Sequence, residues 1–68
     1  REEVFSLLEE VFSRSLSPIE ISRADEWIKG NVDRDIIINS IKDAKVRNEL
    51  SINAIDRIII NKIRSLNN

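Results

Sequence analysis

The side chains that most often carry out catalysis are either missing from this sequence or lack partners. The serines have no His to activate them, and there is no Cys to act as a nucleophile or as a metal ligand. Adjacent acids occur at Glu2–Glu3 and Glu9–Glu10, and Asp33 lies two residues before Asp35. Paired carboxylates can bind a hard cation or exchange protons, but acids on a polar helix face or at a helix start usually face water and complement the helix dipole. We therefore expect no enzyme, no metal site and no cofactor.

Contact with an anion is the other chemistry that these residue types permit. The net charge is only −1, but it is unevenly distributed. Residues 1–41 carry five basic and nine acidic side chains, whereas residues 42–68 carry six basic and three acidic ones. Near the end of the chain, Arg57, Asn61 and Arg64 recur at helical spacing. Such a strip can contact nucleic-acid phosphates or an acidic protein surface, although similar strips are common on helices that only face water.

Length and composition point to a single small domain spanning residues 1–68. A chain of 68 residues lies near the lower size at which proteins fold without disulfides or metals. No apolar run approaches the roughly 20 residues that a membrane-spanning helix needs, and the absence of Cys fits a cytoplasmic location. Because the chain begins at Arg1 rather than at Met, we expect it to be a piece of a longer protein.

Helical periodicity predicts an all-α fold, a small compact bundle of four main helices with room for one extra short turn. The expected helices run from about Glu2 to Arg14, Pro18 to Lys29, Arg34 to Arg47 and Ile52 to Leu66. Several residues mark their ends. Ser17 and Glu20 form the pattern of a capping box around Pro18, and Asp33 and Ser51 are expected to cap the third and fourth helices. Gly30 is expected to end the second helix in the left-handed conformation.

Apolar spacing predicts which side of each helix faces the core. The expected inward residues are Val4, Phe5, Leu8, Val11 and Phe12, then Ile21, Ala24 and Ile28, then Ile37, Ile41 and Ala44, and finally Ile52, Ile55, Ile59, Ile63 and Leu66. Trp27 is interpreted as an anchor between helices, with a partly exposed binding aromatic as the alternative. Ile58 and Ile60 widen the apolar arc of the last helix to about half of its circumference. Ile58 therefore belongs either to the core or to a contact with another chain.

Two stretches of the sequence resemble a known family. Leu-Ser-Pro-Ile-Glu-Ile at residues 16–21, followed by Trp27, resembles the opening of the DnaD-like domain. Residues 48–61, which contain Ile-Asp-Arg-Ile at residues 55–58, resemble its closing segment. The spacing between the two stretches also agrees, so the resemblance covers nearly the whole chain.

The resemblance implies a helical domain of proteins that help to start replication, including primosome components and phage replisome organisers. Members of this family self-associate and bind DNA, single-stranded DNA included, and a less ordered tail after the domain contributes to DNA binding. Their last helix carries a Tyr-xxx-Ile-xxx-Trp pattern linked to both properties. Here Ile58 keeps the middle position, whereas Ala54 and Lys62 replace the two aromatic residues. This replacement removes base stacking from the stripe, although Lys62 still offers a charge to a phosphate.

The sequence therefore predicts a cytoplasmic, non-catalytic replication-initiation module whose partners are DNA, replication-initiation proteins and further copies of itself. The expected contact residues are Arg57, Asn61, Lys62 and Arg64 for DNA, and Ile58 and Ala54 for a protein partner. The alternative is a pure protein-interaction or oligomerisation module, with DNA binding carried by other segments of the parent protein. A helix-turn-helix regulator needs a basic recognition helix, and the second and third helices are too mixed in charge to favour it.

Overall fold

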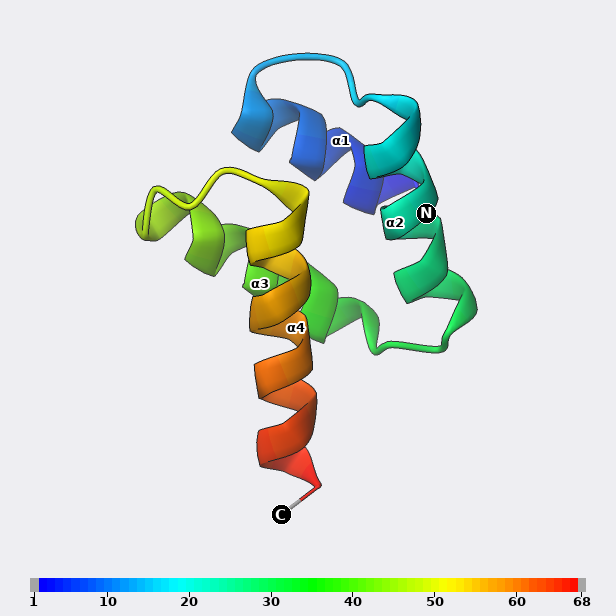
Figure 1. Ribbon diagram of the computed structural model, residues 1–68, viewed down its shortest axis with the longest axis vertical. Helices are drawn as coiled ribbons and strands as arrows, with labels where there is room; N and C mark the ends of the chain where they lie inside the picture. Colours follow the sequence, from blue (N-terminus) through cyan, green and yellow to red (C-terminus); the bar gives the residue numbers. More distant parts are fainter. Residues whose placement is uncertain (1, 68) are drawn as a thin grey trace.

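Four helices make up the part of the chain that the structure describes. This computed structural model describes residues 2–67. The helices are α1 (Glu2–Phe12), α2 (Pro18–Lys29), α3 (Arg34–Val46) and α4 (Ile52–Leu66) (Figure 1). No strand and no additional short helix occurs within residues 2–67. The all-α bundle of four main helices is confirmed.

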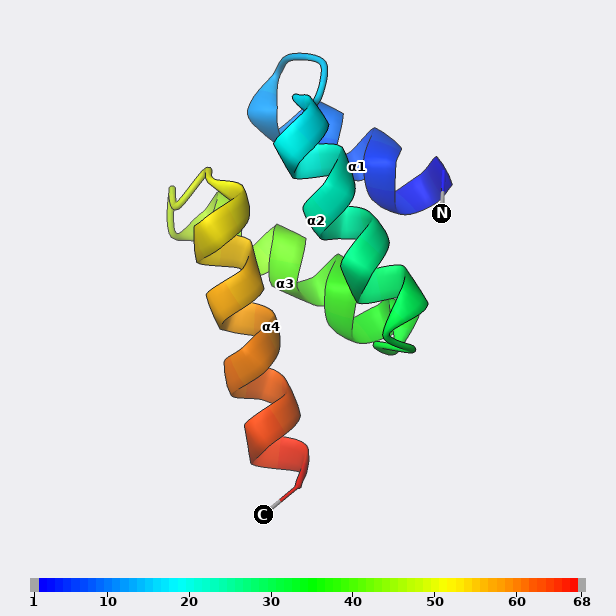
Figure 2. The same cartoon turned by 45° about the vertical axis from the view of Figure 1, so that its right-hand side comes forward.

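The third helix holds the bundle together. α3 packs against both α1 and α4, and α1 also packs against α2. Figures 1 and 2 show that the second half of α4 extends beyond the other three helices, toward the end of the chain. Leu66 lies on this extension and is 71% exposed. Its predicted place in the core was wrong, because the apolar spacing of α4 continues for one turn past the last helix that could cover it.

The core consists of apolar side chains from all four helices. Its buried members are Val4, Leu8, Val11, Ala24, Trp27, Ile37, Ile41, Ala44, Ile52, Ile55, Ile58 and Ile59. Partly buried side chains, including Phe5, Phe12 and Ile63, pack against this cluster. The predicted inward faces of α1 and α3 are therefore confirmed, and the buried Trp27 is an anchor of the core.

The inward face of α2 differs from the prediction by about one residue. Glu20, Ala24 and Trp27 are buried, whereas Ile21 is 38% exposed. Ala24 belongs to both stripes, and Ile28 still packs against the core. At about 100° per residue, the mean direction of the observed stripe is turned from the predicted one by roughly 70°. The cause is a set of polar interactions that hold the Glu20 side chain inward, and the spacing of apolar residues cannot predict them.

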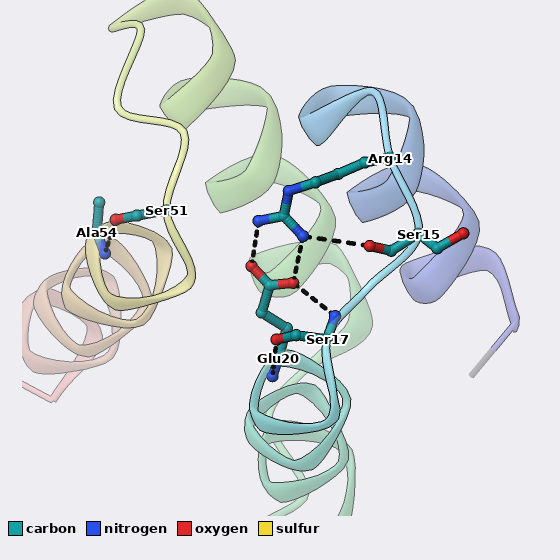
Figure 3. Close-up of polar contacts among 6 residues, drawn as sticks. All are labelled: Arg14, Ser15, Ser17, Glu20, Ser51 and Ala54. Atoms are coloured by element: carbon teal, nitrogen blue, oxygen red, sulfur yellow. Dashed lines mark hydrogen bonds and ion pairs between the residues drawn. The ribbon is translucent and has the colours of Figure 1, made fainter.

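Those interactions are visible in Figure 3, where the Glu20 carboxylate lies between the start of α2 and Arg14. Its Oε1 accepts a hydrogen bond of 2.8 Å from the Ser17 backbone N–H, and the Ser17 hydroxyl accepts one of 3.3 Å from the Glu20 N–H. The Arg14 guanidinium donates to both carboxylate oxygens, at 2.7 and 2.6 Å. The predicted capping box is confirmed, and a bidentate ion pair fastens it to the residues that follow α1.

The buried carboxylate makes stability depend on acid. Hydrogen bonds from the Arg14 guanidinium lower the pKa of Glu20 from its ordinary value of 4.5 to about 2. Because the folded-state pKa is the lower one, the stabilisation is complete above about pH 4.5 and is lost as the pH falls toward 2.

We predict that Glu20→Gln lowers the free energy of unfolding at pH 7 by about 1–3 kcal/mol. Between pH 5 and pH 2, urea unfolding of the variant should depend less on pH than that of the wild type, and equal pH dependence would contradict the role of Glu20.

The first three helices end in the same way, each with a side-chain-bearing residue in the left-handed region. Ser13, Asn31 and Asn48 have φ values of 58°, 59° and 58°. At the end of α2, for example, Asn31 donates its backbone N–H to Ile28 and Val32 donates to Trp27, the two bonds of a Schellman motif. Gly30, at φ −79°, is not the left-handed residue. That prediction was wrong by one position, because Asn also tolerates the left-handed conformation and follows the glycine directly. The predicted caps Asp33 and Ser51 are confirmed.

Ser13 is the least suited of these three residues to a positive φ, because Asn occupies that region more readily. We predict that Ser13→Gly raises the free energy of unfolding by about 0.5–1 kcal/mol, the relief of strain minus the greater freedom of glycine in the unfolded chain. Ser15→Gly is the matched control, since Ser15 has no positive φ, and it should lower stability. Thermal unfolding of both variants measures the difference, and a destabilised Ser13→Gly would refute the strain.

Candidate nucleic-acid interface

The outer face of α4 carries the predicted cationic strip. Ile52, Ile55 and Ile59 are buried, so the opposite side of the helix faces water. Arg57, Asn61 and Arg64 lie on that side, and all three are exposed. Within residues 2–67 neither guanidinium takes part in an ion pair or a hydrogen bond. The structure thus brings these three predicted residues together on one accessible surface.

The described arginines that precede the end of α3 differ in this respect. Arg14 pairs with Glu20, Arg23 with Glu26 and Asp56, and Arg34 with Glu3 and Asp35. All of these arginines precede α4, in the acidic part of the chain. The unpaired guanidinium groups of residues 2–67 are concentrated instead at the end of α3 and along α4.

Lys62 lies apart from the strip, on the flank of α4 that faces α3. Its Nζ is 2.7 Å from a carboxylate oxygen of Asp43, and the Lys62 side chain is 33% exposed. Sequence analysis grouped Lys62 with Arg57 and Arg64 because it is basic and occupies the last position of the family's Tyr-xxx-Ile-xxx-Trp pattern. In the structure Lys62 joins α4 to α3, and only part of its ammonium group is open to a ligand.

Beside Lys62 there is a hollow of about 160 Å³ between the end of α3 and the flank of α4. The residues that line it are Arg47, Ile58, Asn61, Lys62 and Ser65. Sequence reasoning missed Arg47 as a site residue, although it counted this residue among the basic ones of the second half. No local sequence pattern could have identified Arg47, because it lies near Asn61 only after α3 and α4 have packed together.

The two residues expected to face a protein partner are less accessible than the strip. Ile58 is 5% exposed and belongs to the core, where its side chain forms part of the hollow's lining. Ala54 is partly buried in the first turn of α4, where its backbone N–H bonds to the capping Ser51 hydroxyl. The apolar side chain that is open on α4 beside the strip is Ile60, at 42% exposure.

Residues 2–67 contain neither a cluster of three or more acidic residues that could hold a metal ion nor a helix long and apolar enough to cross a membrane.

A family model described as replication initiation and membrane attachment matches residues 5–64, which is most of the chain. The chain belongs to this family. The match confirms the resemblance to the DnaD-like replication-initiation domain. No curated protein and no solved structure matches.

The residues that carry the DnaD-like resemblance meet in the fold. Trp27, from the opening stretch, donates its indole N–H to Asp56 of the closing stretch at 2.8 Å. Arg23 donates to the other oxygen of the same carboxylate at 3.4 Å. The bonds join α2 to α4 and satisfy the polar atom of an indole that is 4% exposed. In this domain the Asp of Ile-Asp-Arg-Ile is therefore structural, whereas its neighbour Arg57 makes no ion pair or hydrogen bond within residues 2–67.

This division between Asp56 and Arg57 can be measured. We predict that Asp56→Ala lowers the free energy of unfolding by about 1–3 kcal/mol, because it leaves the buried indole N–H of Trp27 without an acceptor. Arg57→Ala, at the next residue, should change it by no more than about 0.5 kcal/mol. Urea unfolding followed by the fluorescence of the single Trp reports both values. Equal destabilisation by the two variants would show that Asp56 has no special structural role.

Proposed function

We propose that this domain serves replication initiation without catalysis, by contacting the backbone of DNA through the outer face of α4. The observation that supports the proposal most strongly is the pair of exposed, unpaired guanidinium groups of Arg57 and Arg64, with Asn61 between them. Arginine is well suited to phosphate because its planar donors match two oxygens at once. An interaction of this kind contributes affinity and register rather than sequence preference.

The spacing of the strip fits an extended anionic partner. Arg57 and Arg64 are seven residues apart, which corresponds to about 10 Å along the helix axis. The phosphates of one DNA strand rise by about 3.4 Å per nucleotide in the B form, so the two side chains can reach different phosphates of one strand. Lys62 adds part of a third charge from the flank of the helix.

The proposed binding is weak and independent of base sequence. Stacking on aromatic side chains contributes about 1–3 kcal/mol per base in proteins that bind single strands. Ala54 and Lys62 stand here at the two aromatic positions of the family pattern, and α4 contains no aromatic residue. Affinity therefore depends on phosphate contacts, which weaken steeply with salt. We include single-stranded DNA among the targets and propose a cytoplasmic location.

A protein-interaction module is the second candidate, and specific exposed side chains favour it. Val46 is 87% exposed at the end of α3, Ile19 is 73% exposed at the start of α2, and Leu66 is 71% exposed at the end of α4. Large apolar side chains at such positions suit contacts with replication-initiation proteins or with further copies of the chain. In this case, DNA contact would belong to other segments of the parent protein.

Charge reversal on the strip distinguishes the two candidates. We predict that Arg57→Glu combined with Arg64→Glu weakens binding to a fluorescent single-stranded oligonucleotide by about tenfold or more, and reduces the salt dependence by about one unit of slope per lost contact. The matched control combines Lys29→Glu with Lys45→Glu, which changes the net charge equally on α2 and α3. Fluorescence anisotropy at two salt concentrations measures both, with light scattering to follow oligomer size.

Two outcomes would contradict DNA contact by α4. One is an equal loss in the Lys29 and Lys45 control, which would show that only net charge matters. The other is the absence of salt-sensitive binding by the wild type, which would favour the protein-interaction module.

A further inference from the structure

The hollow beside α4 is built by the way α3 ends. Arg47 is the C-cap residue of α3, with φ −80° and ψ −5°, and its backbone N–H bonds to the Asp43 carbonyl at 3.0 Å. The next residue, Asn48, turns the chain in the left-handed conformation, and Glu49 donates its N–H back to Ala44 at 2.9 Å. These bonds fix the backbone of Arg47 at the end of α3, and the packing of α3 on α4 places this residue at the hollow. The guanidinium is therefore attached to an ordered helix end.

The polar groups around the hollow are mainly unused donors. Within residues 2–67 the Arg47 guanidinium and the Asn61 side-chain amide have no hydrogen-bond partner. Lys62 uses one direction of its ammonium group for Asp43, at 2.7 Å, and an ammonium has three N–H donors. The Ser65 hydroxyl already donates to the Asn61 carbonyl at 3.1 Å.

Among the described residues, the lining includes two cationic groups and no carboxylate. Asp43 contacts Lys62 without lining the hollow itself. A volume of about 160 Å³ is far above the roughly 10–15 Å³ that holds one water molecule. Two cations and an amide around a small open hollow suit a compact oxyanion, and the fork of Arg47 suits two oxygens on one centre.

We infer that this hollow binds a single phosphate group, held by Arg47, Lys62 and the Asn61 amide. The identity of the ligand as a phosphodiester of DNA rests on the proposed function, whereas the anion chemistry rests on the hollow alone. Asn61 lies both on the strip and in the hollow, so a strand that follows Arg57 and Arg64 can place one phosphate there. Asp43 orients Lys62 and at the same time competes with the anion for its charge.

The anion chemistry is tested with inorganic phosphate on the ¹⁵N-labelled chain, with sodium chloride at matched ionic strength as the reference. The signals of the Arg47 Nε–H and the Asn61 side-chain amide should shift together and saturate with one dissociation constant. Arg47→Ala should raise this constant about tenfold. Lys45→Ala is the matched control, because residue 45 lies about 200° around α3 from residue 47. Shifts that do not saturate, or that survive unchanged in Arg47→Ala, would overturn the site.

Asp43→Asn separates a binding role from a purely structural one. Removal of the competing carboxylate should tighten phosphate binding about two- to fivefold, in the range of a single partly exposed ion pair. If the contact of Lys62 with Asp43 only stabilises the fold, the variant would unfold more easily and bind no better. Thermal unfolding of the same sample measures stability, so that the two effects are read separately.

The source of the phosphate is tested with a single-stranded oligonucleotide and with phosphatidylglycerol vesicles. For DNA, Arg47→Ala should weaken binding at least threefold more than Lys45→Ala does. If Arg47→Ala and Lys45→Ala lose DNA binding equally, while the charge reversal at Arg57 and Arg64 still weakens it, the hollow is not a phosphate site for DNA. The proposed function would stand in that case. Saturable phosphate binding without oligonucleotide binding would support the hollow and overturn DNA as its source. Vesicle binding lost in Arg47→Ala, without oligonucleotide binding, would assign the site to a lipid phosphate.

Discussion

The packing of the isoleucine face of α4 on the bundle is the constraint on which the rest of the structure depends. Ile52, Ile55, Ile58 and Ile59 are all buried, and full burial of one such side chain is worth about 1.5–3 kcal/mol. Together they represent a large share of the stability available to so small a domain. They also fix the rotation of the helix about its own axis. A turn of α4 by one residue would expose part of this face and move Arg57 toward the core, so the apolar packing decides which charges reach the solvent.

The position of charges explains how a chain with a net charge of −1 can offer a cationic surface. Exposed ion pairs add little to stability, about 0–1 kcal/mol each, but each of them cancels a local field. Ion pairs neutralise the charges of Arg14, Arg23 and Arg34 in this way, whereas Arg57 and Arg64 have no such partner within residues 2–67. At physiological salt, exposed charges more than about 8 Å apart are largely screened. The composition of the α4 face therefore matters more to an approaching anion than the charge of the whole chain.

The sequence predicted most of the fold because its signals are local. Ser17 and Glu20 are three residues apart, and the caps and apolar repeats lie within single helices, so no knowledge of the packing is needed to find them. The wrong or missing predictions concern residues whose positions depend on contacts between helices or loops. Ile21 is exposed because the ion pair of Glu20 with Arg14 turns α2 inward at an acidic residue, and this pair depends on the path of the chain between two helices. Arg47 was missed for the same reason, since its relation to α4 exists only after α3 and α4 have packed.

The division of labour within the DnaD-like pattern bears on what family membership says about this chain. Glu20 caps and fastens α2, and Trp27 and Asp56 join α2 to α4 through one hydrogen bond. These residues maintain the architecture, so their presence identifies the domain without specifying what its surface binds. The surface differs from the family pattern at Ala54 and Lys62, where stacking side chains are replaced by a methyl group and a charge. Stacking on a base needs an aromatic face, whereas contact with a phosphate needs only a charge. Family membership therefore carries the role in replication initiation, and the DNA contact that we propose for this member rests on the nucleic-acid backbone alone.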